Sequence, residues 1–212
     1  MNIEVGGISF PITIDLQNAE LKGVIPSELV LRELRAEVDK YDGYMIKDTD
    51  FNRWRINDIN LQGLTQGGVK VNVSINLKHR ELIATVFGKK HFTDWVSITI
   101  NGTADFAVSI KANQVDVDYR SHDIKGQSWY SDIVEVLAND LFRDKVAKAL
   151  DSAISQFDGV SITSFLKQGK QIEQGGIKLS LDTLVANTSA SANIIPSGVS
   201  FVVKLPKELV LT

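Results

Sequence analysis

The chain has 212 residues, of which 43% are hydrophobic and 23% are charged, and it contains no cysteine. This composition is typical of an ordered globular protein, and the lack of cysteine excludes disulfides, thiolate metal sites and a cysteine nucleophile. A net charge of −3 provides no basic excess for nucleic acid, and no apolar run approaches the ~18 residues of a membrane-spanning helix. We therefore expect one soluble domain, residues 1–212, with no nucleic-acid partner and no integral membrane segment.

Alternating apolar and polar residues, which are typical of half-buried strands, predict most of the elements. In the strand at residues 8–16, Pro11 lacks an N–H, which favours a sheet edge or pairing on one side only. Asn101-Gly102 is interpreted as a turn that ends one strand, and residues 111–114 as a hairpin connection. The later strands are predicted at residues 69–78, 95–100, 104–110, 115–119, 177–181 and 199–205.

Two segments have helical spacing instead. The first follows Pro26 and runs from Ser27, a candidate N-cap, to about Lys40. The second, Ser131–Phe157, contains neither glycine nor proline, and its apolar residues form a stripe that ends before Asp158-Gly159. At ~1.5 Å per residue this helix would be ~40 Å long. It needs a packing partner of similar length, and an extended twisted sheet is the partner that the strands supply.

The chain has no recognisable signature of a catalytic or metal site. Its three histidines, His79, His91 and His122, lack the spacing of metal ligands, and no nucleophile elbow is present. Gly67-Gly68 and Gly175-Gly176 lead into strands, so they are interpreted as hairpin turns and not as phosphate-binding loops. We expect a protein that is not an enzyme and uses no metal and no cofactor.

Carboxylates and aromatic residues leave two alternatives open. Asp116 and Asp118 share one face of a strand, which favours a solvated sheet face over a catalytic pair. Trp129-Tyr130 either pack in the core or line a mouth where a ligand or a membrane surface enters. Core packing is also the expectation for the other aromatic residues beside element ends, Phe51, Trp54, Phe87, Phe92 and Trp95.

The order of elements resembles that of the tubular lipid-binding (TULIP) superfamily, which includes bactericidal/permeability-increasing-like domains and synaptotagmin-like mitochondrial lipid-binding domains. Within it, the segments 8–14, 98–110 and 177–181, with Trp129 before a helix, look like the bacterial DUF4403-like group. The resemblance implies an α+β fold in which a highly curved antiparallel sheet wraps a long helix, with a shorter N-terminal helix. Strand-like sequence directly after Met1 favours the cytoplasm by default, and a targeting segment removed upstream would favour the bacterial envelope.

The resemblance also implies a function. An apolar seam between helix and sheet would hold a lipid or another elongated hydrophobic molecule, whose burial is worth ~0.8 kcal/mol per methylene. The alternative is a non-catalytic scaffold with a filled core that self-associates, as a possible homodimer, or binds a protein partner through sheet edges such as Ile194-Ile195-Pro196. The ligand-binding candidates lie on the apolar face of their elements: Val71, Val73, Ile75, Phe106, Val108 and Ile110 on strands, and Val134, Leu137, Ala138 and Leu141 on the helix.

Overall fold

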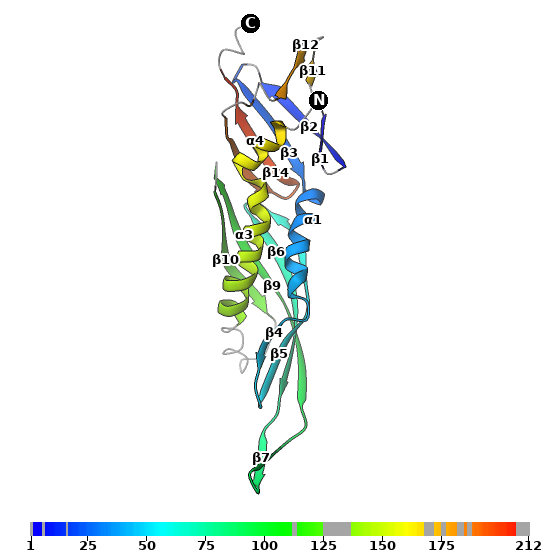
Figure 1. Ribbon diagram of the computed structural model, residues 1–212, viewed down its shortest axis with the longest axis vertical. Coiled ribbons are helices and arrows are strands. Elements are labelled where there is room, and N and C mark those ends of the chain that lie inside the picture. The colour runs from blue at the N-terminus through cyan, green and yellow to red at the C-terminus, as the bar shows by residue number, and fades with distance from the viewer. Residues whose placement is uncertain are drawn as a thin grey trace.

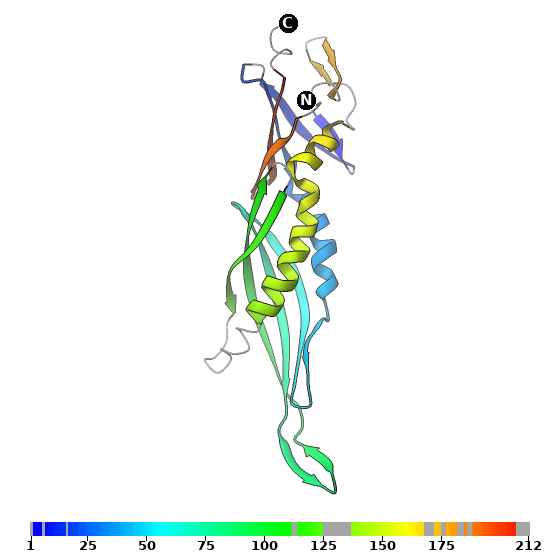
Figure 2. The same cartoon turned by 60° about the vertical axis from the view of Figure 1, so that its left-hand side comes forward.

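The computed structural model describes residues 2–5, 7–15, 17–111, 114–124, 137–167, 172–174, 177–181, 185 and 188–206. The molecule is elongated, and within the described residues two five-stranded antiparallel sheets curl around helices that lie along one face (Figure 1, Figure 2). The predicted α+β class is confirmed: a long helix packs against a highly curved antiparallel sheet, and a shorter helix precedes it in the chain.

One sheet has the strand order β10-β9-β6-β5-β4. Apolar and polar residues alternate along its middle strands, so one face is buried and the other is solvated. β-Bulges interrupt the pairing of β5 with β6 and of β9 with β10, and bulges increase the local twist that curls a sheet. Its strands are β4 (Met45–Asp48), β5 (Asn52–Thr65), β6 (Gly68–His79), β9 (Val96–Lys111) and β10 (Gln114–Ile124).

The other sheet has the order β1-β2-β3-β14-β13. It meets the first sheet at the turn between β5 and β6, where the Gly67 N–H donates a 2.9 Å hydrogen bond to the carbonyl oxygen of Ile194. The two sheets together form a half-barrel. The strands of this second sheet are β1 (Asn2–Val5), β2 (Ile8–Asp15), β3 (Glu20–Pro26), β13 (Ala190–Ile195) and β14 (Gly198–Lys204). Two hairpins stand apart from both sheets: β7 (Leu82–Val86) with β8 (Lys89–Phe92), and β11 (Ile172–Gln174) with β12 (Ile177–Leu179).

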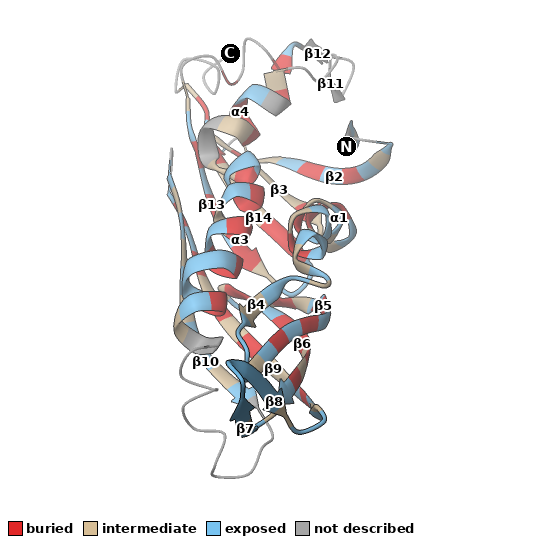
Figure 3. Ribbon diagram, turned by 60° about the horizontal axis from the view of Figure 1, so that its bottom comes forward, coloured by how far each residue is buried: buried red, intermediate tan, exposed pale blue. Residues whose placement is uncertain are grey.

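The helices line the concave side of the half-barrel. α1 packs on α3 and β5, whereas α3 and the π-helix before it pack on β10. Both α1 and α3 carry buried residues among exposed ones, as expected for helices that are packed on one side (Figure 3). The helical elements are α1 (Ser27–Val38), the 3-10 turn η1 (Asp39–Tyr41), the π-helix η3 (Leu137–Val146), α3 (Ala147–Ile154), the 3-10 turn η4 (Ser155–Phe157) and α4 (Gly159–Lys167).

The predicted long helix is confirmed over residues 137–157, and residues 131–136 lie outside the described part. The number of residues per turn changes along this helix, and the spacing of its buried residues changes with it. In η3 the buried Leu141 and Val146 are five residues apart, as expected for i→i+5 hydrogen bonding. In α3 and η4 the buried residues Leu150, Ile154 and Phe157 are three or four apart, as expected for 3.6 residues per turn.

The predicted turn at Asn101-Gly102 is wrong, because β9 runs through it as one strand. Asn101 pairs with Ser74 on β6, and Gly102 pairs with β6 on one side and with β10 on the other. A strand with neighbours on both sides has ladder partners for its backbone groups, which outweighs the local turn preference of Asn-Gly.

Pro11 lies where β2 changes partner. Residues 8–11 pair with β1, and residues 12–15 pair with β3. Of the two alternatives predicted for Pro11, pairing on one side only is confirmed, since β2 lies between β1 and β3 and not at a sheet edge. Because proline has no N–H to donate, it fits the point at which one ladder ends and the next begins.

The predicted N-cap of the first helix is also wrong. Pro26 occupies the cap position, and the Ser27 N–H donates a 2.8 Å hydrogen bond to the carbonyl oxygen of Ser197, in the turn between β13 and β14. This close approach requires Gly198, whose φ is +144° and where a Cβ would lie 1.8 Å from the Ile25 carbonyl oxygen. The β13–β14 turn therefore satisfies the first helical N–H in place of a side chain.

Candidate functional site

The structure brings most of the predicted ligand-binding residues into one apolar core between the long helix and the sheet. Leu137 and Ala138 belong to η3, and Val134 lies outside the described residues. The side chains of Val71, Ile75 and Phe106 have no exposed surface, so this part of the seam is filled by packing. The seven candidates that the structure places in the core are Val71, Val73, Ile75, Phe106, Val108, Ile110 and Leu141.

Aromatic side chains pack at the η3 end of the seam, where Phe142 meets β9 and β10. The rings of Tyr119 and Phe142 stack with centroids 5.9 Å apart, and Phe106 meets Phe142 edge-on at 6.4 Å. The Arg143 guanidinium lies 5.4 Å from the centroid of the Tyr119 ring, and the Tyr119 hydroxyl hydrogen-bonds to Nδ1 of His122. Burial raises the pKa of Tyr119, so the phenol is neutral at physiological pH.

An apolar pocket of about 140 Å³ opens at the other end of the seam, between α1 and the η4–α4 segment. Four buried side chains provide its apolar lining: Ile25 at the end of β3, Leu29 on α1, Phe157 on η4 and Ile162 on α4. Sequence reasoning missed this pocket. Its residues come from segments more than a hundred positions apart, and no local pattern places them together.

Asp158 creates the pocket's far wall by redirecting the chain. It follows η4, and its carboxylate Oδ1 accepts a 2.6 Å hydrogen bond from the Ser161 N–H while its carbonyl accepts a 2.8 Å bond from the Ile162 N–H. This is the N-cap arrangement that begins a new helix. The sequence prediction that the long helix ends at Asp158-Gly159 is therefore confirmed, and the start of α4 is an addition to it.

Charged and polar groups surround the pocket mouth. Arg32 and Glu33 follow Leu29 by one helical turn, so they share its face of α1 and form an ion pair with Nε and Oε1 3.2 Å apart. Opposite them, the Gln156 side chain donates a 2.9 Å hydrogen bond to the Ala153 carbonyl. Apolar walls below a charged rim suit a ligand with a hydrophobic end and a polar end.

The pocket's size limits what it holds by itself. An apolar cavity of about 150 Å³ accommodates a molecule such as benzene. The pocket therefore fits one end of an acyl chain or a single ring, and a longer ligand has to continue into the seam.

The predicted hairpin turn at Gly67-Gly68 and the solvated carboxylates fit the structure. Gly67 has a φ of +66° in the turn between β5 and β6, whereas Gly175 and Gly176 lie outside the described residues. Asp116 and Asp118 are exposed on β10, so their interpretation as a solvated face is confirmed. In the part of the chain that the structure describes, no three histidine, aspartate or glutamate residues are grouped to hold a metal ion.

The aromatic residues do not all pack in the core as expected. Trp54 is buried, Phe92 and Trp95 are half-buried, and Trp129-Tyr130 lie outside the described residues. Core packing is wrong for Phe51, which is exposed, and above all for Phe87, whose side chain is fully exposed in the β7–β8 turn. Phe87 cannot reach the core because its hairpin extends beyond both sheets (Figure 1).

No helix among the described residues has both the length and the apolar character needed to cross a membrane. No family model and no curated protein matches the sequence. The fold has a weak likeness to a crystal structure of lipopolysaccharide binding protein, with 9% sequence identity and a TM-score of 0.28. That alignment covers 89% of the present chain and 50% of the other, so this chain spans about half the length of that protein.

Proposed function

We propose that the protein binds an elongated hydrophobic ligand, such as a lipid, in the seam between the long helix and the sheet. The observation that carries the proposal is the apolar pocket between α1 and α4, which opens at the end of that seam and has a charged rim. The hydrophobic end of the ligand would occupy the pocket, and its polar end would meet Arg32 and Glu33. The resemblance of the sequence to the tubular lipid-binding superfamily implies the same class of ligand.

Binding of this kind needs neither a catalytic group nor a metal or cofactor. The driving force is the transfer of methylene groups from water, at ~0.8 kcal/mol each. Ala149 and Ala153 are small buried residues of α3, which directly precedes the η4 segment that lines the pocket. A chain that enters the pocket would extend along this part of the helix toward Leu141 and the apolar faces of β6 and β9.

Filling the pocket with a side chain tests the proposal. Leu29→Trp should place an indole in the 140 Å³ space and prevent binding of a fluorescent fatty-acid probe. The native protein should bind the probe saturably near one equivalent, and unlabelled fatty acid should displace it. Ala36→Trp is the matched control, because Ala36 is exposed on the same helix and does not line the pocket.

Two results would contradict the proposal. One is native protein that does not bind the probe at micromolar concentration. The other is a Leu29→Trp protein that folds and still binds the probe as the native protein does. Melting curves of both variants are needed to show that loss of binding is not loss of folding.

A second candidate function is a scaffold whose seam stays closed. The complete burial of Val71, Ile75 and Phe106 favours it, because these side chains already occupy the space that a ligand would take. Such a scaffold would act through its sheet edges, of which β13 is one, and would self-associate or bind a protein partner. Absence of probe binding, together with a dimer in sedimentation experiments, would favour this function over the first.

A further inference from the structure

The hairpin of β7 and β8 projects from the end of the molecule opposite α4 (Figure 1, Figure 2). Its turn residue Phe87 is 101% exposed, and the neighbouring Val86 is 47% exposed. On the same strand Ile83 is 67% exposed. Monomeric proteins usually expose large apolar residues singly, so three at one projecting tip indicate a binding surface.

The turn geometry holds Phe87 outward at a cost in backbone energy. Phe87 and Gly88 have φ values of 48° and 77°, and they connect Val86 to its pairing partner Lys89. This is a two-residue type I′ turn, in which asparagine, aspartate or glycine is favoured at the first position. A bulky residue with a positive φ is strained, and Phe87 gains no core packing in return.

A β-bulge exposes the second apolar residue of the tip. The pairing of β7 with β8 shifts between Leu82 and Ala84, which leaves Ile83 as the extra residue. Ile83, Val86 and Phe87 are exposed apolar residues of one short segment, and we call them the apolar tip.

The base of the hairpin is held by stacked cations and rings. The Arg80 guanidinium lies 4.0 Å from the ring centroid of Phe92 and 4.4 Å from that of Trp95, and the Arg53 guanidinium lies 4.8 Å from Trp95. Lys90 on β8 forms a 3.0 Å ion pair with Asp50. These contacts join the hairpin to the end of the sheet that contains β5, so the apolar tip is carried on an anchored stem.

Basic residues outnumber acidic ones in and beside the hairpin, although the whole chain has a net charge of −3. Residues 78–94 contain four lysine or arginine residues and two acidic ones, and Asp50, which pairs with Lys90, adds a third carboxylate. Lys89 directly follows the turn and is exposed. The partner that complements a protruding apolar tip with basic flanks has an apolar interior below a negatively charged surface.

We propose that the β7–β8 hairpin docks the protein on an anionic lipid bilayer. The apolar tip enters the interfacial region, while Lys89 contacts lipid phosphates. A bilayer suits this shape because it surrounds a narrow projection with apolar groups on all sides, whereas a protein partner would need a matching cavity. The docking does not depend on a ligand in the pocket between α1 and α4.

Vesicle co-sedimentation with the full chain tests this interaction, using phosphatidylcholine with and without phosphatidylglycerol. Phe87→Asn is the informative variant, because asparagine is favoured in a type I′ turn and the hairpin should remain folded. Since it removes a phenyl group that lipid would bury, binding should fall about tenfold or more. Met45→Asn, at an exposed apolar residue of β4 outside the hairpin, is the matched control and should bind like the native protein.

A second variant tests how much the charge of Lys89 contributes to vesicle binding. Lys89→Gln should weaken binding to phosphatidylglycerol vesicles about fivefold, with no effect on phosphatidylcholine alone. Leu29→Trp should still bind vesicles, and Phe87→Asn should still bind the fatty-acid probe, so failure of docking and failure of the proposed function are distinguishable.

Several results would overturn the docking proposal. These are native protein that does not bind phosphatidylglycerol vesicles, equal binding to both kinds of vesicle, and unchanged binding by Phe87→Asn. A dimer that forms without lipid and disappears in Phe87→Asn would also overturn it, because a second copy of the chain would then cover the apolar tip.

Discussion

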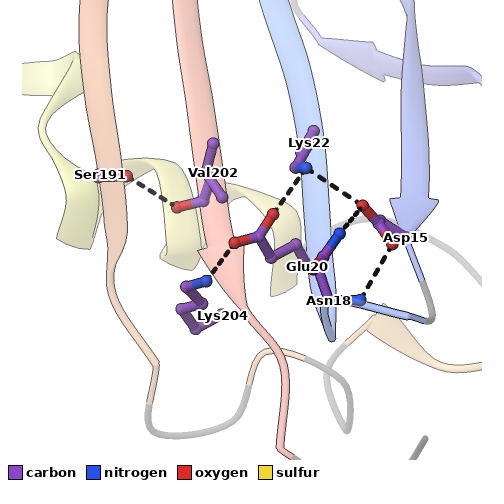
Figure 4. A network of polar contacts seen from close by, with 7 residues as sticks. All are labelled: Asp15, Asn18, Glu20, Lys22, Ser191, Val202 and Lys204. Atoms are coloured by element: carbon purple, nitrogen blue, oxygen red, sulfur yellow. Dashed lines mark hydrogen bonds and ion pairs between the residues drawn. The ribbon is translucent and has the colours of Figure 1, made fainter.

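Asp15 is the residue whose ionisation the fold changes most clearly. Its carboxylate accepts hydrogen bonds from the side-chain and backbone N–H groups of Asn18, at 2.8 Å and 3.0 Å, and pairs with Lys22 at 3.3 Å (Figure 4). These contacts, of which the Asn18 side chain is the strongest, lower the pKa of Asp15 to about 2. Lys22 also pairs with Glu20, which in turn contacts Lys204 on β14, so the network joins three adjacent strands.

The lowered pKa predicts how Asp15 affects stability against pH. Because the pKa of Asp15 is about 2 in the folded state and about 3.9 in an unfolded chain, the unfolded state binds more protons between these values. Its stabilising contribution is therefore complete above about pH 4 and is lost as the pH falls through about 2. Asp15→Asn should lower the melting temperature near pH 7, and the difference from the native protein should vanish in strong acid.

Thermal melts over this pH range check the prediction. Asp118→Asn, at an exposed residue of β10, controls for the loss of one negative charge. A difference between Asp15→Asn and native protein that persisted unchanged at pH below about 2 would show that the effect is not due to ionisation.

At the scale of single elements, the long helix contributes buried residues to the core along its described length. Leu141 is 1% exposed in η3, between the helix and the sheet. Leu141→Ala should lower the free energy of unfolding by about 2–5 kcal/mol, because it removes buried methyl groups and leaves a cavity. Lys148→Ala, at an exposed position of α3, should change it by less than about 0.5 kcal/mol.

Urea denaturation of both variants measures these differences directly. A cost for Leu141→Ala as small as that of Lys148→Ala would mean that the long helix does not pack on the sheet in solution.

The sequence predicts regular elements well and irregular ones poorly. β6 and β14 are evident because their alternation is unbroken, β10 because it alternates as far as Tyr119, and α1 because its apolar residues recur at helical spacing. β5 escapes detection although it is one of the longest strands. Register shifts between Ile56 and Asp58 and between Leu61 and Gly63 break its period of two.

The apolar tip of the β7–β8 hairpin escapes prediction for a different reason. An aromatic residue beside a strand end is usually buried, and only the position of the hairpin beyond both sheets exposes Phe87. The local signal is the sequence Val86-Phe87-Gly88-Lys89-Lys90, in which a bulky apolar residue occupies a turn next to two lysines. A bulky apolar residue in such a turn indicates a role in binding and not in core packing.

At the scale of the whole molecule, the seam could be predicted and the pocket could not. The seven candidates that the structure places in the core face inward because of the period of their own elements, so the sequence indicates their burial. The pocket depends instead on how α1 packs beside η4 and α4. No local pattern in the sequence specifies that contact, because it joins elements that lie far apart along the chain.

The central claim is that the seam and its pocket hold a hydrophobic ligand, and native mass spectrometry of the purified protein tests it most directly. We predict a species heavier than the bare 23.4 kDa chain by the mass of one lipid-like molecule, which is lost after extraction with organic solvent. The extra mass should be retained in Ala36→Trp and missing in Leu29→Trp. A native protein that shows only the mass of the bare chain, and gains none when mixed with fatty acid, would contradict the claim.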